Sequence, residues 1–293
     1  MYTTVNGNPT YSVATTEGLR DWVTLIHPLG ADLTVWDQVA SSLGSHWNVL
    51  RYDLRSHGRT SGNTVTHISD LADDLQALLN ARHIVQTHLV GLALGGMIAL
   101  SFALRYPAHV KRMVLCNTSA AASTEQRRTL REQAIDVDRH GLDSIKKPTL
   151  ASWLTADFRD HHPEVVEPLQ DALLACSAPG YAMACKAMAA FDVRRRLPKI
   201  AAPTLIINTR EHHTDSAGAE DGPRKTPTEH ADPVADPRPS AAARVLMAGI
   251  PDAQLIEMQG AHLAAIEHPG IFARSVDEFL KTTNAIRDIP PAH

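Results

Sequence analysis

A histidine and a set of carboxylates are the residues of this sequence best suited to proton transfer. His262 follows an expected strand and residues 260–261, on a loop that leads into a helix. An imidazole titrates near neutral pH, so His262 is the candidate general base. His57 is the competing histidine, but its neighbours predict a braced loop in which Asp53 and Arg55 pair.

A nucleophile is missing from the turn that would present one. Residues 87–92 form an expected buried strand and a helix is expected from Gly95, so the chain must turn sharply at Ala93. Such a turn holds its central residue in a strained conformation, and Gly91 and Gly95 flank it where a Cβ would collide. The methyl group of Ala93 can neither attack a carbonyl nor donate a proton. A Rossmann phosphate loop is excluded, because the glycines lack the G-x-G-x-x-G spacing.

Strands and helices alternate along most of the chain. Asn6-Gly7 predicts a hairpin between two short strands, because this dipeptide tolerates the positive φ of a tight turn. Further strands are expected at 23–27, 48–52, 87–92, 112–116, 204–208 and 254–258, and helices at 34–43, 68–79, 95–106, 240–249 and 270–281. This order predicts an α/β fold with a mostly parallel, doubly wound sheet, whose ligands bind at the carboxyl ends of the strands.

Two segments interrupt the alternation. Residues 120–197 contain consecutive helical segments without a strand, which predicts a helical cap over a core of residues 1–119 and 198–281. Residues 212–239 are rich in Gly, Pro, Asp and His and have no apolar periodicity, so we expect an inserted flexible loop there. Residues 282–293 are expected to be a frayed tail.

Four ordered blocks of the sequence resemble the α/β-hydrolase fold family. Within that family the chain looks most like the 3-oxoadipate enol-lactone hydrolases and related capped esterases and lactonases. The resemblance spans about residues 15–281. Its blocks are His27-Pro28-Leu29-Gly30, Tyr52-Asp53-Leu54-Arg55-Ser56-His57-Gly58-Arg59, Gly91-Leu92-Ala93-Leu94-Gly95-Gly96 and Gly260-Ala261-His262.

The resemblance implies an acyl-transfer site. Ala93 occupies the nucleophile position, and the backbone N–H groups of Leu94 and Leu29 match the donors of the oxyanion hole. Pro28 has no N–H and cannot serve. His262 matches the base, and the implied activity is hydrolysis of a small carboxylic ester or enol-lactone.

The acid that would orient His262 is harder to place. The family carries it after the strand expected at 204–208, before a turn with proline and a helix. Counting from the strand, Glu211 or Asp215 is nearest; counting back from the helix, Asp232-Pro233 fits the turn, with Asp236 next. We favour Asp232, although Asp-Pro is also common in solvent-exposed turns.

Ala93 leaves two interpretations of the function open. In the first, an ester or lactone hydrolase has been inactivated by replacement of its serine, and the intact oxyanion loop favours this. In the second, the alanine is natural, which the disrupted acid region favours. The fold would then be a non-hydrolytic acid/base catalyst of the lyase or isomerase kind that uses His262, or a small-molecule binding protein.

Composition limits the partners. The 293 residues are 44% hydrophobic with a formal net charge of −4, which gives no electrostatic reason to expect nucleic acid. No apolar run approaches the about 18 residues of a membrane helix, and residues 1–7 are polar, so no membrane association and a cytoplasmic location are expected.

The same inspection predicts no cofactor and no metal. The three cysteines are scattered, and the spacing of His212, His213 and His230 matches no zinc pattern. The expected partner is a small-molecule substrate, and the Arg194–Arg196 run suggests that it is anionic, although such a run is usually a solvated face. The oligomeric state is left open.

Overall fold

One twisted sheet forms the centre of the molecule. The computed structural model describes residues 1–16, 18–62, 65–210 and 239–282. Within these ranges eight strands pair in the order β1-β2-β4-β3-β5-β6-β7-β8, and all pairings from β4 to β8 are parallel. The strands are β1 (Tyr2–Val5), β2 (Asn8–Thr15), β3 (Trp22–Ile26), β4 (Asn48–Tyr52), β5 (Thr87–Leu92), β6 (Val110–Cys116), β7 (Thr204–Arg210) and β8 (Ala253–Gln259). The predicted α/β class with a mostly parallel sheet is confirmed.

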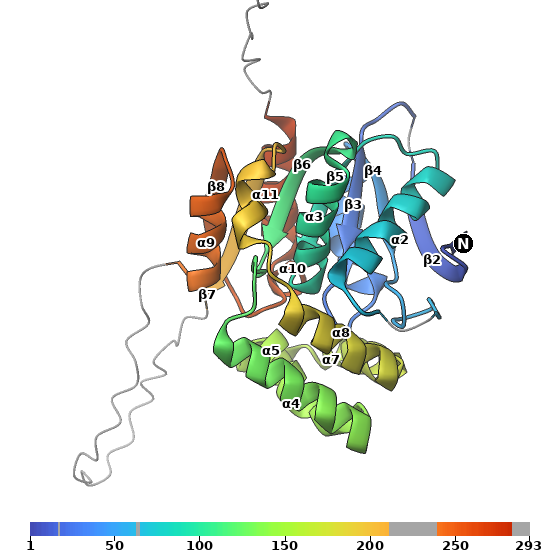
Figure 1. Cartoon of the computed structure of the whole chain (residues 1–293), viewed down its shortest axis with the longest axis vertical. Helices are drawn as coiled ribbons and strands as arrows, with labels where there is room; N and C mark the ends of the chain where they lie inside the picture. The colour runs from blue at the N-terminus through green and yellow to red at the C-terminus, as the bar shows by residue number, and fades with distance from the viewer. Residues whose placement is uncertain (17, 63–64, 211–238, 283–293) are drawn as a thin grey trace, which may run out of the picture.

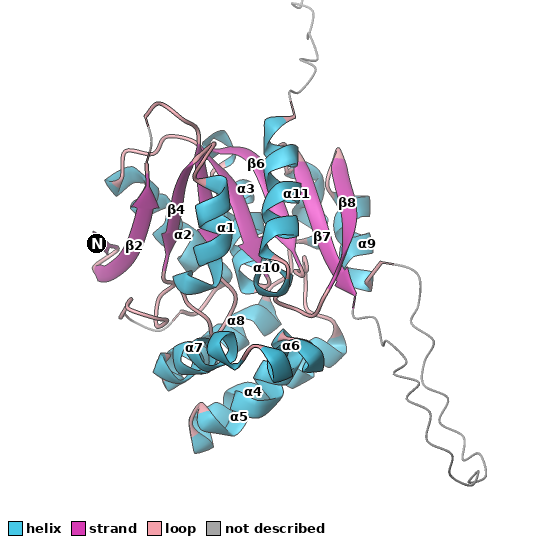
Figure 2. Ribbon diagram, turned by 180° about the vertical axis from the view of Figure 1, so that it is seen from behind, coloured by secondary structure: helices cyan, strands magenta, loops and turns pink. Residues whose placement is uncertain are grey.

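Helices cover both faces of this sheet (Figures 1 and 2). On one face lie α2 (Ile68–Ala81), α3 (Leu94–Arg105) and α9 (Ala241–Gly249), and on the other α1 (Asp37–Leu43) and α11 (Pro269–Lys281). All six residues of β5 are buried, as expected for a central parallel strand that is apolar on both sides. No helix in the described ranges has both the length and the apolarity to cross a membrane.

The remaining helices form a separate layer at the carboxyl ends of the parallel strands (Figure 2). It consists of α4 (Thr124–His140), α5 (Asp143–Trp153), α6 (Ala156–His161), α7 (Pro163–Ala175) and α8 (Ala178–Ala190). We call it the helical layer. It contacts the core closely, because the N–H of Ser177 donates to the carbonyl of Ser56 at 3.0 Å.

Short elements connect these layers. They are the 3-10 turns η1 (Leu33–Trp36), η2 (Pro107–His109) and η3 (Arg194–Lys199) and the short helix α10 (Ala264–Glu267). The helix expected over 34–43 is therefore divided into η1 and α1. The Asp32 carboxylate accepts from the Thr34 N–H at 2.9 Å and starts the tight turn η1.

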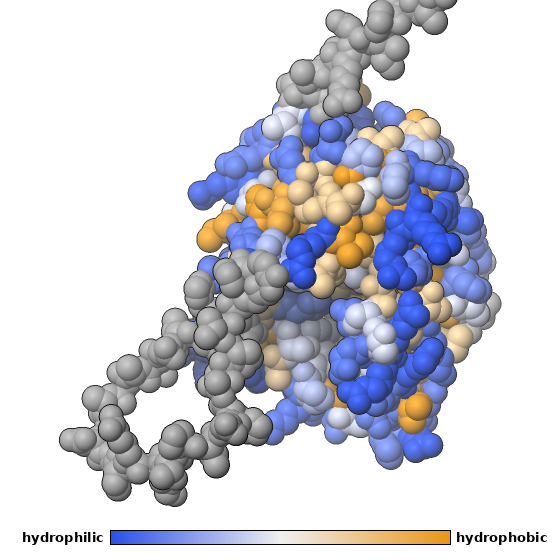
Figure 3. All heavy atoms as spheres, turned by 60° about the vertical axis from the view of Figure 1, so that its left-hand side comes forward, coloured by the Kyte–Doolittle hydropathy of each residue, from blue (hydrophilic) through white to orange (hydrophobic). Residues whose placement is uncertain are grey.

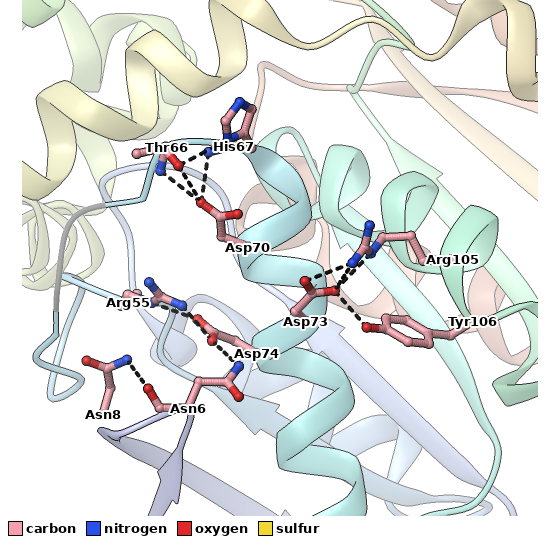
Figure 4. A network of polar contacts seen from close by, with 10 residues as sticks. All are labelled: Asn6, Asn8, Arg55, Thr66, His67, Asp70, Asp73, Asp74, Arg105 and Tyr106. Atoms are coloured by element: carbon pink, nitrogen blue, oxygen red, sulfur yellow. Dashed lines mark hydrogen bonds and ion pairs between the residues drawn. The ribbon is translucent and has the colours of Figure 1, made fainter.

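The expected pair of Asp53 and Arg55 is wrong. The Arg55 guanidinium instead forms two hydrogen bonds with the Asp74 carboxylate of α2, at 2.8 and 2.6 Å (Figure 4). Asn6 of the β1–β2 turn donates to the same carboxylate at 2.9 Å. Arg55 thus fixes the loop after β4 to α2. Asp53 forms its hydrogen bonds with other groups, among them the Leu33 N–H after β3.

Candidate active site

The turn between β5 and α3 has the geometry of a nucleophile elbow. Ala93 has φ 49° and ψ −109°, a conformation that costs an L-residue of order 1–3 kcal/mol. A Cβ on Gly91 would lie 2.3 Å from the Gly95 carbonyl oxygen, and one on Gly95 would lie 2.1 Å from that of Ile26. The two glycines are therefore required sterically, as the spacing predicted.

The end of β6 holds the elbow in this conformation. The Ala93 N–H donates to the Cys116 carbonyl at 2.9 Å, and the Thr118 hydroxyl donates to the Ala93 carbonyl at 2.6 Å. Thr118 also packs tightly on α3, since a Cβ on Gly96 would lie 2.5 Å from its side chain. The strained residue is fixed by its neighbours although its side chain is only a methyl group.

His27 organises the loop after β3. Its Nε2 accepts from the Leu54 N–H at 2.9 Å, so the proton of the neutral ring is on Nδ1, which donates to the Pro28 carbonyl at 2.8 Å. Burial lowers the pKa of His27 to about 4, which keeps this form. Because a trans peptide points its C=O and N–H in opposite directions, holding the Pro28 carbonyl also orients the Leu29 N–H.

Two N–H groups have the freedom that oxyanion donors need. Leu94 is the first residue of α3, where an N–H has no partner within the helix. Among the described residues, neither the Leu94 N–H nor the Leu29 N–H donates to a backbone carbonyl. The positive end of the α3 dipole adds to the field at Leu94.

Asp53 also stabilises the loop after β3. Its carboxylate accepts from the Leu33 N–H and the Arg59 N–H, both at 2.8 Å. Burial raises the pKa of Asp53 to about 6, against the opposing effect of these donors. The neighbouring His57 is buried and its Nδ1 contacts the Arg55 carbonyl at 2.9 Å, so it braces this loop and does not line the cavity described below.

His262 lies on the loop between β8 and α10. Its backbone carbonyl accepts from the Asn117 side-chain amide at 2.9 Å, and the same amide donates to the Thr209 hydroxyl at the end of β7. Burial lowers the pKa of His262 to about 4. Within the described part of the chain the imidazole has no hydrogen bond and no carboxylate partner. Asp232 and the alternative acids Glu211, Asp215 and Asp236 lie outside the described residues, as do His212, His213 and His230.

A cavity of about 930 Å³ brings the predicted groups together. Leu29, Ala93 and His262 all line it, and Leu94 is buried directly behind Ala93. The helical layer forms the opposite wall through Trp153 and Tyr181. Seen from the side of α9, the surface is hollowed between the sheet and the helical layer (Figure 3).

The polar lining of the cavity is mostly uncharged. Besides His262 and Tyr181, its described polar residues are Asn117, Thr118, Ser119, Ser123, Glu125, Gln126, Thr129, Gln133, Thr149, Ser152, Arg194, Asn208, Thr209 and Ser240. The Arg194 guanidinium is bonded to the Asp192 carboxylate at 2.5 and 3.0 Å. In the described ranges, no group of three His, Cys, Asp or Glu side chains is arranged to hold a metal ion.

Fold and cavity together define an α/β hydrolase. Residues 21–137 match the model of the alpha/beta hydrolase fold family. The chain is 31% identical over 257 residues to 3-oxoadipate enol-lactonase 2 of Acinetobacter baylyi, with 87% of each chain covered, and 31% identical over 179 residues to enol-lactonase 1 of that organism, covering 61% of this chain and 66% of the relative. The chain therefore belongs to the α/β-hydrolase fold family, as predicted.

A solved structure agrees with this assignment. The enol-lactonase from Burkholderia xenovorans LB400 superimposes with a TM-score of 0.83 at 27% identity, covering 96% of this chain and all of that one. The match extends through the helical layer as well as the core, because so little of either chain is left out. The two relatives and this solved structure are all enol-lactonases.

Three residues that make contacts in the site were not predicted from the sequence: Asn117, Thr118 and Glu267. Asn117 and Thr118 follow β6, and residues just after a parallel strand are natural candidates for an active-site edge, so a signal existed. Glu267 is different. It is a single acidic residue directly after the apolar run 263–266, and nothing in its local pattern points to the bonds that it makes with Ala261 and Thr155.

Proposed function

We propose that this cavity binds a small carboxylic ester or enol-lactone, with the substrate carbonyl oxygen at the N–H groups of Leu29 and Leu94. One observation carries the proposal: a strained elbow, two N–H groups without backbone partners and a histidine lie at one cavity. The elbow conformation has a cost and serves to present a side chain. The chain keeps this strained conformation although Ala93 presents only a methyl group. This supports a site for acyl transfer from which the nucleophile has been removed.

The reaction that the site would support with a serine at this position is the following. The hydroxyl oxygen attacks the carbonyl carbon while its proton passes to Nε2 or Nδ1 of His262, and the oxyanion accepts hydrogen bonds from Leu29 and Leu94. The C–O bond of the leaving alcohol then breaks, and the alcohol takes the proton from His262. A water oxygen then attacks the carbonyl carbon of the acyl-enzyme and its proton passes to His262. The bond from that carbon to the serine oxygen breaks, the serine oxygen takes the proton from His262, and the product acid is released.

In the parent chain Ala93 blocks the covalent route, so the proposal predicts substrate binding with little turnover.

We also propose that the helical layer acts as the cap over the substrate, and that Asp232 orients His262. The Arg194 charge is largely compensated by Asp192, so its attraction for an anionic substrate is expected to be weak.

The decisive experiment is the Ala93→Ser substitution. Loss of the nucleophile costs a serine hydrolase about six orders of magnitude in turnover, so restoring it should raise hydrolysis of aryl esters and enol-lactones by several orders of magnitude. A fluorophosphonate probe should label the variant and leave the parent unlabelled. Adding Asp232→Asn or Asp236→Asn to this variant identifies the acid, since only the orienting residue should lower the rate strongly. An Ala93→Ser protein that folds, yet is neither labelled nor active, contradicts the proposal.

A second function is supported by the state of His262. His262 lines the cavity and its ring is neutral at pH 7, because burial lowers its pKa, so a ring nitrogen can accept a proton from water or from a substrate without a covalent intermediate. The parent chain would then show an activity that disappears in His262→Ala. If the parent is inactive and His262→Ala binds ligands as the parent does, this second function is excluded.

A further inference from the structure

One buried carboxylate connects the histidine loop with the helical layer. Glu267, the last residue of α10, is only 9% exposed. Its Oε2 accepts from the Ala261 N–H at 2.6 Å, and its Oε1 accepts from the N–H and the hydroxyl of Thr155 at 2.8 and 2.7 Å. Ala261 immediately precedes His262, whereas Thr155 is the N-cap residue of α6 in the helical layer.

A second hydrogen bond runs parallel to this connection. The Leu263 N–H donates to the Trp153 carbonyl at 2.9 Å, so residues on both sides of His262 are bonded to the segment between α5 and α6. Trp153 also reaches the opposite loop of the site, because a Cβ on Gly30 would lie 3.4 Å from its ring. The segment from Trp153 to Thr155 therefore contacts both halves of the site.

The chemistry at Glu267 requires a carboxylate. Three donors converge on its two oxygens, and an ionised carboxylate only accepts. An amide of the same shape would place an NH₂ group against either the Ala261 N–H or the Thr155 N–H. Gly260 is part of the arrangement, because a Cβ there would lie 2.7 Å from Glu267 Oε2.

We propose that Glu267 is a positioning residue that holds the histidine loop against the helical layer, so that displacement of this layer also displaces His262. Substrate must pass beside the helical layer to reach the cavity, and the placement of the base then depends on the layer returning over the bound substrate. The catalytic consequence rests on the proposed ester or lactone hydrolysis, but the mechanical connection does not.

The first test uses the parent chain and needs no activity. Glu267→Gln is compared with Glu278→Gln, a matched change at an exposed position of α11. Amide exchange measured by NMR should be at least about 10-fold faster at Ala261 and Thr155 in Glu267→Gln, as expected for loss of a bond to a charged group. The His262 ring signal, assigned from its loss in His262→Ala, should titrate at a higher pH, because a released loop admits water to the ring. Glu278→Gln should change neither measurement.

The second test uses the Ala93→Ser background. Glu267→Gln should slow labelling by the fluorophosphonate about 10-fold or more, while the inhibition constant of the product acid changes less than about threefold, since base placement acts on the transition state. A residue that only stabilised the fold would leave the labelling rate of the folded fraction unchanged.

The outcomes separate the two proposals. If the Ala93→Ser protein is never labelled, the proposed function fails, and the exchange and titration measurements still decide the role of Glu267. A folded Glu267→Gln protein whose Ala261 exchange and His262 titration match the parent overturns the connection. If Glu267→Gln does not fold, the Thr155→Val variant is used instead, because it removes only one of the three donors to Glu267. We then expect a smaller increase in Ala261 amide exchange and a smaller shift of the His262 titration. Unchanged Ala261 exchange in Thr155→Val overturns the proposal.

Discussion

The loop after β3 and the loop after β8 both line the cavity, yet they are held in different ways. On the oxyanion side, the His27 imidazole bonds two backbone groups and Asp53 bonds two more. On the base side, the backbone of the loop is bonded through Asn117 and Glu267, but the His262 imidazole has no hydrogen bond within the described residues. Among the described residues, the proposed oxyanion side therefore has its side chains bonded to backbone groups, whereas the side chain of the proposed base does not.

The largest expected effect compares the two histidines directly. His27→Ala removes two hydrogen bonds and a fully buried ring, so we expect the free energy of unfolding to fall by about 3–5 kcal/mol at pH 7.5. Among the described residues His262→Ala removes no hydrogen bond, and it leaves space that opens into an existing cavity, so a loss at least about 2 kcal/mol smaller than that of His27→Ala is expected. Urea denaturation of both variants measures the difference. Equal losses in the two variants would contradict this comparison.

The contrast also explains how far sequence reasoning reached. The elbow is local: Gly91, Ala93 and Gly95 lie within five residues, and a Cβ on Gly91 would collide with Gly95. The strand positions followed from apolar runs, which determine the fold class. Each of these features could be predicted because the residues that cause them are close together in the chain.

The base side could not be predicted in the same way. The bonds of Glu267 and Asn117 join residues 112 and 145 positions apart in sequence, and no periodicity indicates such contacts. Arg55 shows the same limit, since its nearest carboxylate in the sequence is Asp53 but its partner is Asp74, 19 residues away on α2. The identity of the acid, with Asp232 favoured, stays a prediction.

A smaller effect is expected from acid. Burial lowers the pKa of His57 to about 3 and the pKa values of His27, His88 and His262 to about 4, from an ordinary value of 6.5. Below pH 6.5 the unfolded chain binds protons that the folded chain excludes. The free energy of unfolding should therefore fall as the pH falls from 6.5 toward 4, by up to about 1.4 kcal/mol per pH unit for each histidine.

Two of these histidines brace the oxyanion side, so this region should determine much of the acid sensitivity. His57→Phe should reduce the slope of unfolding free energy against pH by about one proton, with urea denaturation at pH 7.5 and 5 as the measurement. The control is His140→Phe, at an exposed position of α4. A slope that is the same in the parent and in His57→Phe would mean that His57 takes up its proton in the folded state.

The smallest expected effect concerns the backbone support of the base. In Asn117→Asp the oxygen that accepts from the Thr209 N–H at 3.0 Å is kept, but the group that donated to the His262 carbonyl becomes a second acceptor. Two acceptors then face each other at a half-buried position, and the repulsion is expected to displace the histidine loop. We expect about 10-fold slower acylation in the Ala93→Ser background, equivalent to about 1.4 kcal/mol, with the oxyanion side unchanged. Asn80→Asp, the same chemical change on the exposed end of α2, should leave the rate unaltered. If Asn117→Asp instead raises the rate, the new carboxylate orients His262. That result would contradict the proposal that Asp232 already supplies this carboxylate.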